Sequence, residues 1–396
     1  MRIKTKLSLL LERSLLMFFS AAAKKRRPHK KTGKVLIART DGLGDYILWL
    51  SVEENLRNLY PDSRIEMLFD ERKPTPELAA YDPYIDGFFS LPIVSWRRFL
   101  SVLAMSRKEY DVIIQPVYSR LALTDTLLFA AKAQKRITID TNGQYLTPQE
   151  LKWTNHGYDV IVKASARLEH ELTRCAELLR GLGVKEFHAC LPDINCLAIT
   201  VKKLAGDYIM VFPSASWSGK VWEKEKYAQV IQWLLRHFSG SIYLCGDSGD
   251  REICQWIGKA VNVPSRLQSL AGKIDMAQLT AHIKGARLVF GNDTGAIHVA
   301  VACKIPAVAI VANREIGRFL PYQTNNAAEQ KYYPVCVHDE DMKCSGCVLK
   351  GEVVCRYQKD VLQVLPCIQH ITTAQVIKVL KEKIREAPCG ISYQIS

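Results

Sequence analysis

The stretch Lys34-Val-Leu-Ile-Ala38, followed directly by Arg39-Thr-Asp-Gly-Leu-Gly-Asp45, decides the fold class of this chain. Its first five residues are mostly apolar, and their β-branched content predicts a short buried strand. The apolar periodicity of residues 46–59 predicts a helix, so Gly42 and Gly44 lie in a turn from strand to helix. A strand, a glycine turn and a helix in this order are typical of the first unit of a parallel sheet.

The same alternation of strands and helices extends over most of the 396 residues. It continues to about residue 182, gives way to a basic, weakly periodic link at 191–205, and restarts with an apolar run at 208–212. We therefore predict an α/β protein with two consecutive Rossmann-like domains. The predicted boundaries are 1–32 for an N-terminal tail, 33–195 and 206–370 for the two domains, and 371–396 for a C-terminal helix and tail.

The net charge of +14 is concentrated at the N-terminus. Residues 1–31 contain ten Lys or Arg and one Glu, which account for nine of the fourteen charges. The rest of the chain has an ordinary charge, so we expect no nucleic-acid partner. No apolar run reaches the ~18 residues that cross a bilayer. The twelve cysteines are scattered along a long chain, which indicates a reducing, cytoplasmic compartment.

Residues 7–23 predict an amphipathic helix within this basic tail. One face carries Leu7, Leu10, Leu11, Leu15, Phe18 and Phe19, and another carries Lys6, Arg13 and Ser20. Such a helix, followed by the basic run 24–27, is expected to lie peripherally in the interface of an anionic membrane. Two alternatives stay open here: a disordered basic leader, and a cleaved secretory signal that ends in the small residues 20–23.

Asp45 stands at the start of the first predicted helix, beside the carboxyl end of the strand. It could be an N-cap aspartate or a general base that faces a ligand. Gly42 and Gly44 would let a ligand approach the backbone closely. A dinucleotide fingerprint requires a third glycine where Ile47 stands, so the loop argues against NAD binding.

A second candidate site opens a helix in the second half of the chain. Asp293, Thr294 and Gly295 follow an apolar run, and the amides and dipole at the start of the helix suit a phosphate. His298 lies one turn further on, on the face of Thr294. The alternative is a capped helix with a packed histidine.

A third candidate site follows the predicted strand at 208–212. Ser214, Ser216 and Lys220 stand in the loop after this strand and provide hydroxyl and ammonium donors. Such donors suit a diphosphate. A solvated lysine is the alternative.

These three segments, in this order across two Rossmann-like halves, resemble glycosyltransferase family 9, the ADP-heptose:lipopolysaccharide heptosyltransferases. The resemblance spans residues 34–311, and Gly291-Asn-Asp-Thr-Gly295 with His298 is its most specific part. It implies the GT-B fold, with an N-terminal acceptor domain and a C-terminal nucleotide-sugar donor domain facing across a cleft. It also implies an inverting, metal-independent glycosyltransferase that needs no cofactor.

The same resemblance implies the substrates. The enzyme is expected to move a sugar, most specifically heptose from ADP-heptose, to a lipopolysaccharide or another lipid-linked acceptor of the cell envelope. Its expected place is the inner face of the cytoplasmic membrane. The alternative functions are a nucleotide-sugar epimerase on the same fold and an NAD-dependent oxidoreductase.

The resemblance also assigns roles to individual residues. Asp45 is the base that deprotonates the acceptor hydroxyl, in an acceptor-side loop with Gly42 and Gly44. The donor-binding residues that it implies are Lys220, Asp293, Thr294, Gly295 and His298, with Asp247 or Asp250 for the ribose. Ser214 and Ser216 join this donor-binding set from the loop pattern described above. The chain departs from the family pattern at Glu223, where proline is frequent, and at Arg39, where lysine is frequent.

A cysteine pattern lies near the C-terminus, with Cys344, Cys347, Cys355 and Cys367 spaced as Cys-x2-Cys-x7-Cys-x11-Cys. A structural zinc site normally has a second closely spaced pair, which this pattern lacks. We therefore expect free thiols or a structural clamp of the loop, and a bound metal is the alternative.

Overall fold

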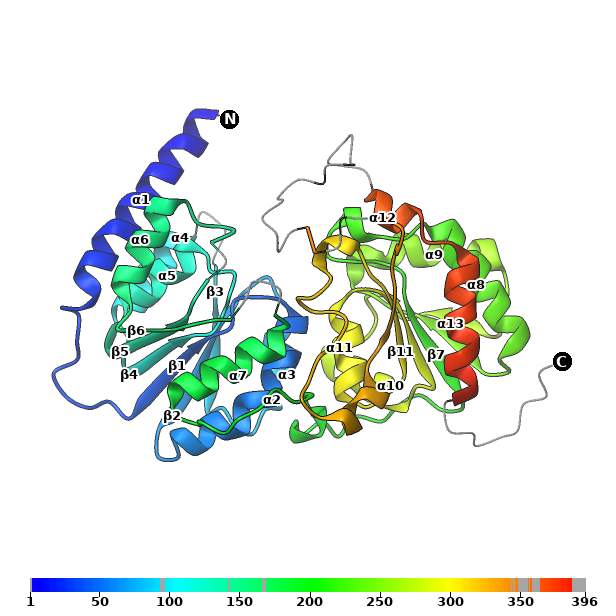
Figure 1. Ribbon diagram of the computed structural model, residues 1–396, viewed down its shortest axis with the longest axis horizontal. Coiled ribbons are helices and arrows are strands. Elements are labelled where there is room, and N and C mark those ends of the chain that lie inside the picture. The colour runs from blue at the N-terminus through cyan, green and yellow to red at the C-terminus, as the bar shows by residue number, and fades with distance from the viewer. Residues whose placement is uncertain are drawn as a thin grey trace. The chain divides into compact units, whose positions relative to one another are not determined.

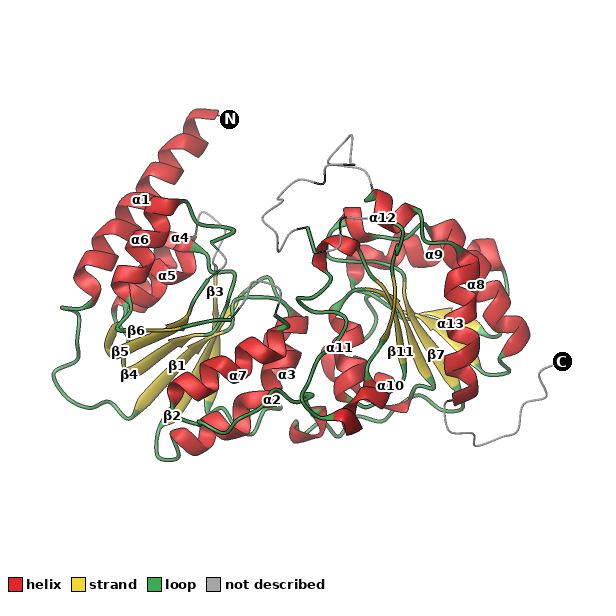
Figure 2. Ribbon diagram, in the orientation of Figure 1, coloured by secondary structure: helices red, strands yellow, loops and turns green. Residues whose placement is uncertain are grey.

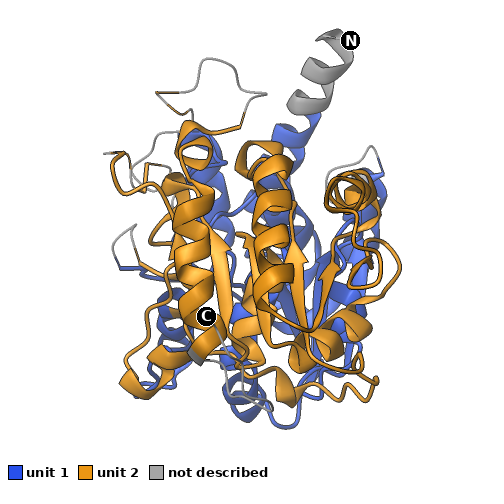
Figure 3. Ribbon diagram, turned by 90° about the vertical axis from the view of Figure 1, so that its right-hand side faces the viewer, with its two compact units in different colours: residues 1–167, 173–189 blue, residues 168–172, 190–396 orange. Residues whose placement is uncertain are grey.

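The computed structural model describes residues 2–92, 97–141, 143–165, 169–342, 344, 346–347, 355, 357 and 364–386 (Figure 1). Each half of the chain contains one parallel sheet of six strands, with helices packed against its faces (Figure 2). The chain divides into two compact units, residues 1–167 with 173–189 and residues 168–172 with 190–396 (Figure 3). The predicted α/β class with two parallel sheets is therefore confirmed.

Unit 1 has the strand order β3-β2-β1-β4-β5-β6. Its strands are β1 (Lys34–Ala38), β2 (Arg64–Asp70), β3 (Gly87–Leu91), β4 (Glu109–Gln115), β5 (Lys132–Ile139) and β6 (Val160–Val162). Its helices are α1 (Arg2–Ala23), α2 (Leu43–Leu59), α3 (Thr75–Ala79), α4 (Arg98–Ser106), α5 (Ala122–Ala130) and α6 (Pro148–Gly157), and most of α7 (Glu171–Leu182). β1 pairs with β2 and β4 and is buried over residues 35–38, which explains its continuous apolar sequence.

Unit 2 has the strand order β12-β11-β10-β7-β8-β9. Its strands are β7 (Tyr208–Phe212), β8 (Ser241–Leu244), β9 (Leu267–Ser269), β10 (Leu288–Asn292), β11 (Ala307–Ile310) and β12 (Val335–Val337). Its helices are α8 (Lys224–His237), α9 (Arg251–Val261), α10 (Met276–Gly285), α11 (Gly295–Ala302), α12 (Pro366–Gln369) and α13 (Thr373–Glu386). α13 packs against α8, so the C-terminal helix belongs to the core of this unit.

The apolar pattern of the sequence predicts a helix over residues 121–133 and a strand over 136–139. In the structure, α5 ends at Ala130 and β5 already begins at Lys132. The apolar run passes from the helix into the strand without a glycine or proline to mark the change. α6 was not predicted, although Thr147 and Glu150 form a capping box in which Glu150 Oε2 accepts the Thr147 backbone N–H at 2.8 Å.

The N-terminal helix α1 packs on α5 and α6 of unit 1. Leu16 and Ala23 are buried against Phe129 and Tyr158. The guanidinium of Arg136 in β5 donates to the Ala23 carbonyl at 2.8 Å, which secures the end of the helix. Among the residues described, no helix has both the length and the apolar character to cross a membrane.

Candidate functional site

The residues predicted to bind the donor phosphate meet at the carboxyl edge of the sheet in unit 2. β7 and β11 flank β10 in parallel, so the loops after these three strands lie at one edge. Lys220 belongs to the short 3-10 turn Ser218–Lys220 after β7, and Asp293 directly follows β10. The Lys220 Nζ lies 3.3 Å from the Asp293 Oδ2.

Glu315, which sequence reasoning missed, is the second carboxylate partner of Lys220. It ends a 3-10 turn, Asn313–Glu315, in the loop after β11. Burial alone disfavours the charged amine of Lys220, but Asp293 and Glu315 outweigh this effect and raise its pKa. Lys220 is therefore a charged ammonium held between two carboxylates. Glu315 stands in an irregular loop after β11, so no sequence pattern marked it as a site residue.

His298 lies in the first half of α11, and its side chain is almost completely buried. Its Nδ1 is 2.7 Å from the hydroxyl oxygen of Tyr322, and its Nε2 is 4.0 Å from the Asp293 Oδ1. Burial raises the pKa of Tyr322 well above its ordinary value, so the phenol keeps its proton. The structure thus places His298 beside Asp293, with its ring oriented by Tyr322, a residue that sequence reasoning missed.

Thr294 is the N-cap residue of α11 and has an extended backbone (φ −140°, ψ 168°). Its Oγ1 is buried, and within the described part of the chain no hydrogen-bond partner reaches it. The first amides of a helix have no intrahelical acceptor, and the dipole makes this end attractive to anions. Thr294 and Gly295 are therefore placed to donate hydrogen bonds to a phosphate.

Close packing between β7 and β10 holds these loops together. A Cβ at Gly291 would lie 2.5 Å from the Phe212 carbonyl oxygen of β7, so this position requires glycine. The next residue, Asn292, accepts the backbone N–H of Trp222 through its Oδ1 at 3.1 Å. These contacts attach the loop that carries Lys220 to the end of β10.

The two candidate ribose-binding acids have different surroundings. Asp250 is hydrogen-bonded by the Ser214 side chain and by the backbone N–H of Asp247, the latter at 2.9 Å. Burial raises the pKa of Asp250. Asp247 is exposed, and its Oδ1 caps the following turn by accepting the Gly249 N–H at 2.6 Å. Asp250 is therefore the acid in contact with the loop after β7, where Ser216 is exposed.

In unit 1, the loop with Gly42 and Gly44 leads into helix α2, and residues of this loop cap the start of the helix. Gly42 is the N-cap residue of α2, and the half-buried Asp45 is its third helical residue. The Asp45 Oδ2 accepts the Gly42 backbone N–H at 3.1 Å. The alternative in which Asp45 is itself the N-cap is therefore wrong, because Gly42 takes that position and Asp45 completes the cap. Gly44 lies in the first turn of α2.

A buried charged cluster lies beneath this loop and was not foreseen. The Arg39 guanidinium is 2.8 Å from Asp41 and lies over the Trp49 ring, with 5.2 Å from its carbon to the ring centroid. Glu53 of α2 is 2% exposed. Burial and then the neighbouring Asp82 raise the pKa of the Glu53 carboxyl, which Arg39 offsets in part. The sequence feature that could have revealed this cluster is Glu53, a carboxylate on the otherwise apolar face of α2.

The four cysteines of the C-terminal pattern are all buried. Burial raises the pKa of Cys367 to about 11, and Cys344, Cys355 and Cys347 lie near enough to add to this shift. Over the described ranges, no three His, Cys, Asp or Glu side chains are arranged to hold a metal ion.

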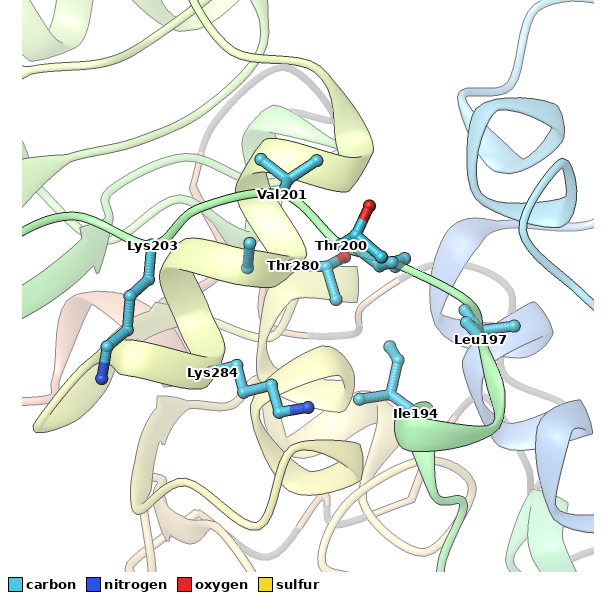
Figure 4. Close-up of a pocket in the computed structure, with 9 residues that line it drawn as sticks. Ile194, Leu197, Thr200, Val201, Lys203, Thr280 and Lys284 are labelled. Carbon is cyan, nitrogen blue, oxygen red and sulfur yellow. The ribbon is translucent and has the colours of Figure 1, made fainter.

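A cavity of about 410 Å³ lies elsewhere in unit 2 (Figure 4). The segment 194–203 forms one wall, with Leu197 and Val201, and α10 forms the other, with Thr280 and Lys284. None of the predicted site residues lines it.

Comparisons with known proteins agree with the motifs. The model of "Glycosyltransferase family 9 (heptosyltransferase)" matches residues 103–345. Lipopolysaccharide heptosyltransferase 3 of Escherichia coli strain K12 is 22% identical over 308 residues, which cover 71% of this chain and 83% of that protein.

Two solved structures share the fold at 16% sequence identity. The structure of the E. coli heptosyltransferase WaaC with ADP-2-deoxy-2-fluoro heptose aligns to this chain with a TM-score of 0.63. The alignment covers 88% of this chain and 99% of the WaaC chain. The structure of the iron-containing dodecameric glycosyltransferase TibC from enterotoxigenic E. coli aligns with a TM-score of 0.54. This alignment covers 91% of this chain and 78% of the TibC chain. The family match extends over more than half of the chain, so the resemblance seen in the motifs is confirmed. The chain is a glycosyltransferase that belongs to family 9, the heptosyltransferase family.

Proposed function

We propose that this enzyme transfers heptose from ADP-heptose to a lipopolysaccharide or another lipid-linked acceptor, with inversion at the anomeric carbon. The observation that carries the proposal is the Lys220–Asp293 pair beside the N-terminus of α11. A cation, a carboxylate and helix amides at one sheet edge suit a sugar diphosphate. Relatives support the choice of sugar, since one is named a lipopolysaccharide heptosyltransferase and WaaC was solved with an ADP-heptose analogue.

Each site residue then has a defined task. Asp45 accepts the proton of the acceptor hydroxyl while that oxygen attacks the anomeric carbon of the donor. The bond from this carbon to the diphosphate oxygen breaks, and ADP leaves with the electron pair. Lys220 and Thr294 stabilise the negative charge that develops on the diphosphate. Asp293 accepts hydrogen bonds from the sugar hydroxyls.

Asp250 is the proposed ligand of the ribose, in preference to Asp247. Asp250 contacts Ser214 in the loop after β7, whereas Asp247 is exposed and caps its own turn. A carboxylate that accepts hydrogen bonds from two ribose hydroxyls would fix the nucleoside beside the diphosphate.

We also propose that the transfer itself requires no metal ion. Lys220 and the amides of α11 supply positive charge where the leaving group develops its negative charge. TibC is described as iron-containing, so metal content has to be measured separately from activity. The test combines elemental metal analysis of the purified protein with transfer assays before and after chelation. Loss of transfer on chelation that a metal ion restores would contradict the proposal.

The proposed acceptor indicates where in the cell the enzyme acts. A lipid-linked acceptor lies in a membrane, so we place the enzyme peripherally at the inner face of the cytoplasmic membrane. The basic residues within 1–31 and the anionic headgroups would attract each other.

A nucleotide panel tests the proposed donor. Thermal unfolding of the full chain is followed with ADP, UDP, GDP and NAD, because a ligand that binds the native state raises the apparent stability by about 2.7 kcal/mol at 100 times its Kd. We expect ADP to raise Tm more than the others, and ADP-heptose more than ADP-glucose. Mass spectrometry of a lipopolysaccharide acceptor then detects the added heptose. A Tm response to UDP or NAD without one to ADP would contradict the assignment.

A further inference from the structure

The N-terminal helix is packed on unit 1 with a polar stripe toward α6, in which Ser20 is buried and Arg13 is half exposed. Ser20 is 1% exposed, and its hydroxyl donates to the Trp153 carbonyl of α6. Arg13, one heptad earlier on the same stripe, pairs with Glu150 of α6 at 3.0 Å. Leu16 and Ala23 complete the inward face.

Large apolar side chains of the same helix consequently point to solvent. Leu11 is 48% exposed, Met17 49% and Phe18 62%. Eight large hydrophobic side chains are exposed among the described residues, and three of them belong to this helix. Leu11, Met17 and Phe18 are not needed to hold α1 in place, because the opposite face makes the contacts with α5 and α6.

Contacts of Arg26 and Phe19 with unit 1 fix the orientation of this outward face. Arg26, just after the helix, donates to the Ala130 carbonyl of α5 at 2.8 Å and to the Ser106 carbonyl of α4 at 3.2 Å. The ring of Phe19 packs into the core formed by α4 and α5. The outward face therefore keeps one orientation relative to the sheet of unit 1.

The charge at the end of the helix selects the partner. Lys24 and Lys25 are exposed directly after the apolar side chains, and Lys30 and Lys31 follow. The sequence has no acidic residue between Glu12 and Asp41. An apolar face that ends in exposed basic side chains matches the interface of an anionic bilayer, where apolar groups enter the acyl boundary and lysines meet the headgroups.

We propose that Leu11, Met17 and Phe18, with Lys24 and Lys25, form a preformed docking face by which the folded unit 1 lies on an anionic membrane surface. This inference deepens the membrane association proposed above and rests on it. It differs from binding by a flexible basic tail, because helix α1 stays attached to α5 and α6 when the membrane is bound. The lipid then meets the face of α1 opposite to Ser20.

The test measures binding of the purified full chain to vesicles of phosphatidylcholine, with and without phosphatidylglycerol. We expect Leu11→Glu/Phe18→Glu to weaken binding to the anionic vesicles at least about tenfold. Lys24→Gln/Lys25→Gln should weaken it by a similar factor and abolish the preference for anionic lipid. The matched controls are Ala198→Glu/Thr200→Glu and Lys202→Gln/Lys203→Gln, exposed positions of unit 2 that change the charge equally.

Two further measurements separate the possible outcomes. All variants should keep the Tm of the parent and its response to ADP, so that a loss of vesicle binding is not a loss of fold or of the donor site. Unchanged binding of the Leu11→Glu/Phe18→Glu variant would overturn the docking face while leaving the proposed transferase activity intact. A full chain that is dimeric by light scattering, that these substitutions make monomeric and that binds no vesicles would overturn it in favour of a second copy.

Discussion

Lys220 is paired with two carboxylates, so the diphosphate of the proposed donor would have to compete with them for its ammonium group. Asp293 lies 3.3 Å from the amine, and Glu315 contacts it from the loop after β11. A diphosphate repels both carboxylates while it attracts the ammonium. We infer that Glu315 gives up its contact with Lys220 when the donor binds, whereas Asp293 stays to meet the sugar.

Glu315→Gln should therefore tighten donor binding. Removing this charge relieves repulsion toward the diphosphate and frees Lys220, so we expect the Kd for ADP to fall about fivefold. The measurement is isothermal titration with ADP, with Glu340→Gln as a control that removes an exposed carboxylate of the same unit. Weaker ADP binding by Glu315→Gln would show instead that the carboxylate itself helps to hold the donor.

Glu53 should make the stability of unit 1 depend on pH. Burial raises the pKa of its carboxyl in the folded state, so the folded chain retains a proton that the unfolded chain releases. The free energy of unfolding therefore falls as pH rises above about 4.3, the ordinary Glu value, toward the folded pKa. Glu53→Gln removes this loss, so its Tm should exceed that of the parent by a few degrees at pH 8, and the difference should shrink as the pH falls to about 4.

The control for the pH dependence of Glu53→Gln is a substitution at the adjacent residue. Glu54 is exposed on the same helix, and Glu54→Gln should leave the pH profile unchanged. A Tm for Glu53→Gln that falls below the parent at pH 8 would mean that Arg39 holds Glu53 as a carboxylate.

At the scale of elements, α1 is an integral helix of unit 1. Its inner face covers Phe129 and Tyr158, and its last carbonyl accepts a hydrogen bond from the buried Arg136. Removing the helix would expose these rings and leave one acceptor of the guanidinium missing. A chain without residues 1–31 is therefore expected to lose stability as well as any membrane contact.

Two leucines of α1 separate its structural face from its exposed face. Leu16 is 1% exposed and Leu11 is 48% exposed. Leu16→Ala should lower the free energy of unfolding by about 2–5 kcal/mol, because it leaves a cavity between α1 and α5. Leu11→Ala should change it by less than about 0.5 kcal/mol. Urea unfolding of both variants measures the difference, and equal effects would contradict the orientation of the helix.

At the scale of the whole molecule, the two proposed chemical tasks belong to different units. The residues proposed to bind the diphosphate, together with His298, lie in unit 2, whereas Asp45 lies in unit 1. Donor binding and base catalysis should therefore be separable by mutation.

Asp45→Asn tests the division directly. We expect kcat to fall by about 10²–10⁴-fold, the usual contribution of a general base, with the Kd for ADP within about twofold of the parent. Asp62→Asn, an exposed position of the same unit, is the matched control. Transfer at a near-parental rate by Asp45→Asn would exclude it as the base, and a large loss of ADP affinity would contradict the separation.

The sequence by itself determined the fold class and most of the candidate site. Buried parallel strands such as 34–38 and 208–212 are continuous apolar runs, and the residues that follow such strands are brought to one edge by the topology alone. The resemblance to family 9 assigned Lys220 and Asp293, 73 positions apart, to one donor site, and this topology explains why the two side chains meet.

Tertiary structure alone decided which other side chains share that site and which face of α1 is exposed. Glu315 and Tyr322 belong to an irregular loop after β11, and a loop path leaves no periodic pattern in sequence. The apolar spacing of α1 predicted a helix, yet Ser20 points inward and Phe18 outward. The reason is that Glu150 and Trp153 of α6 provide partners for Arg13 and Ser20, and the sequence of one helix does not contain the surface against which it packs.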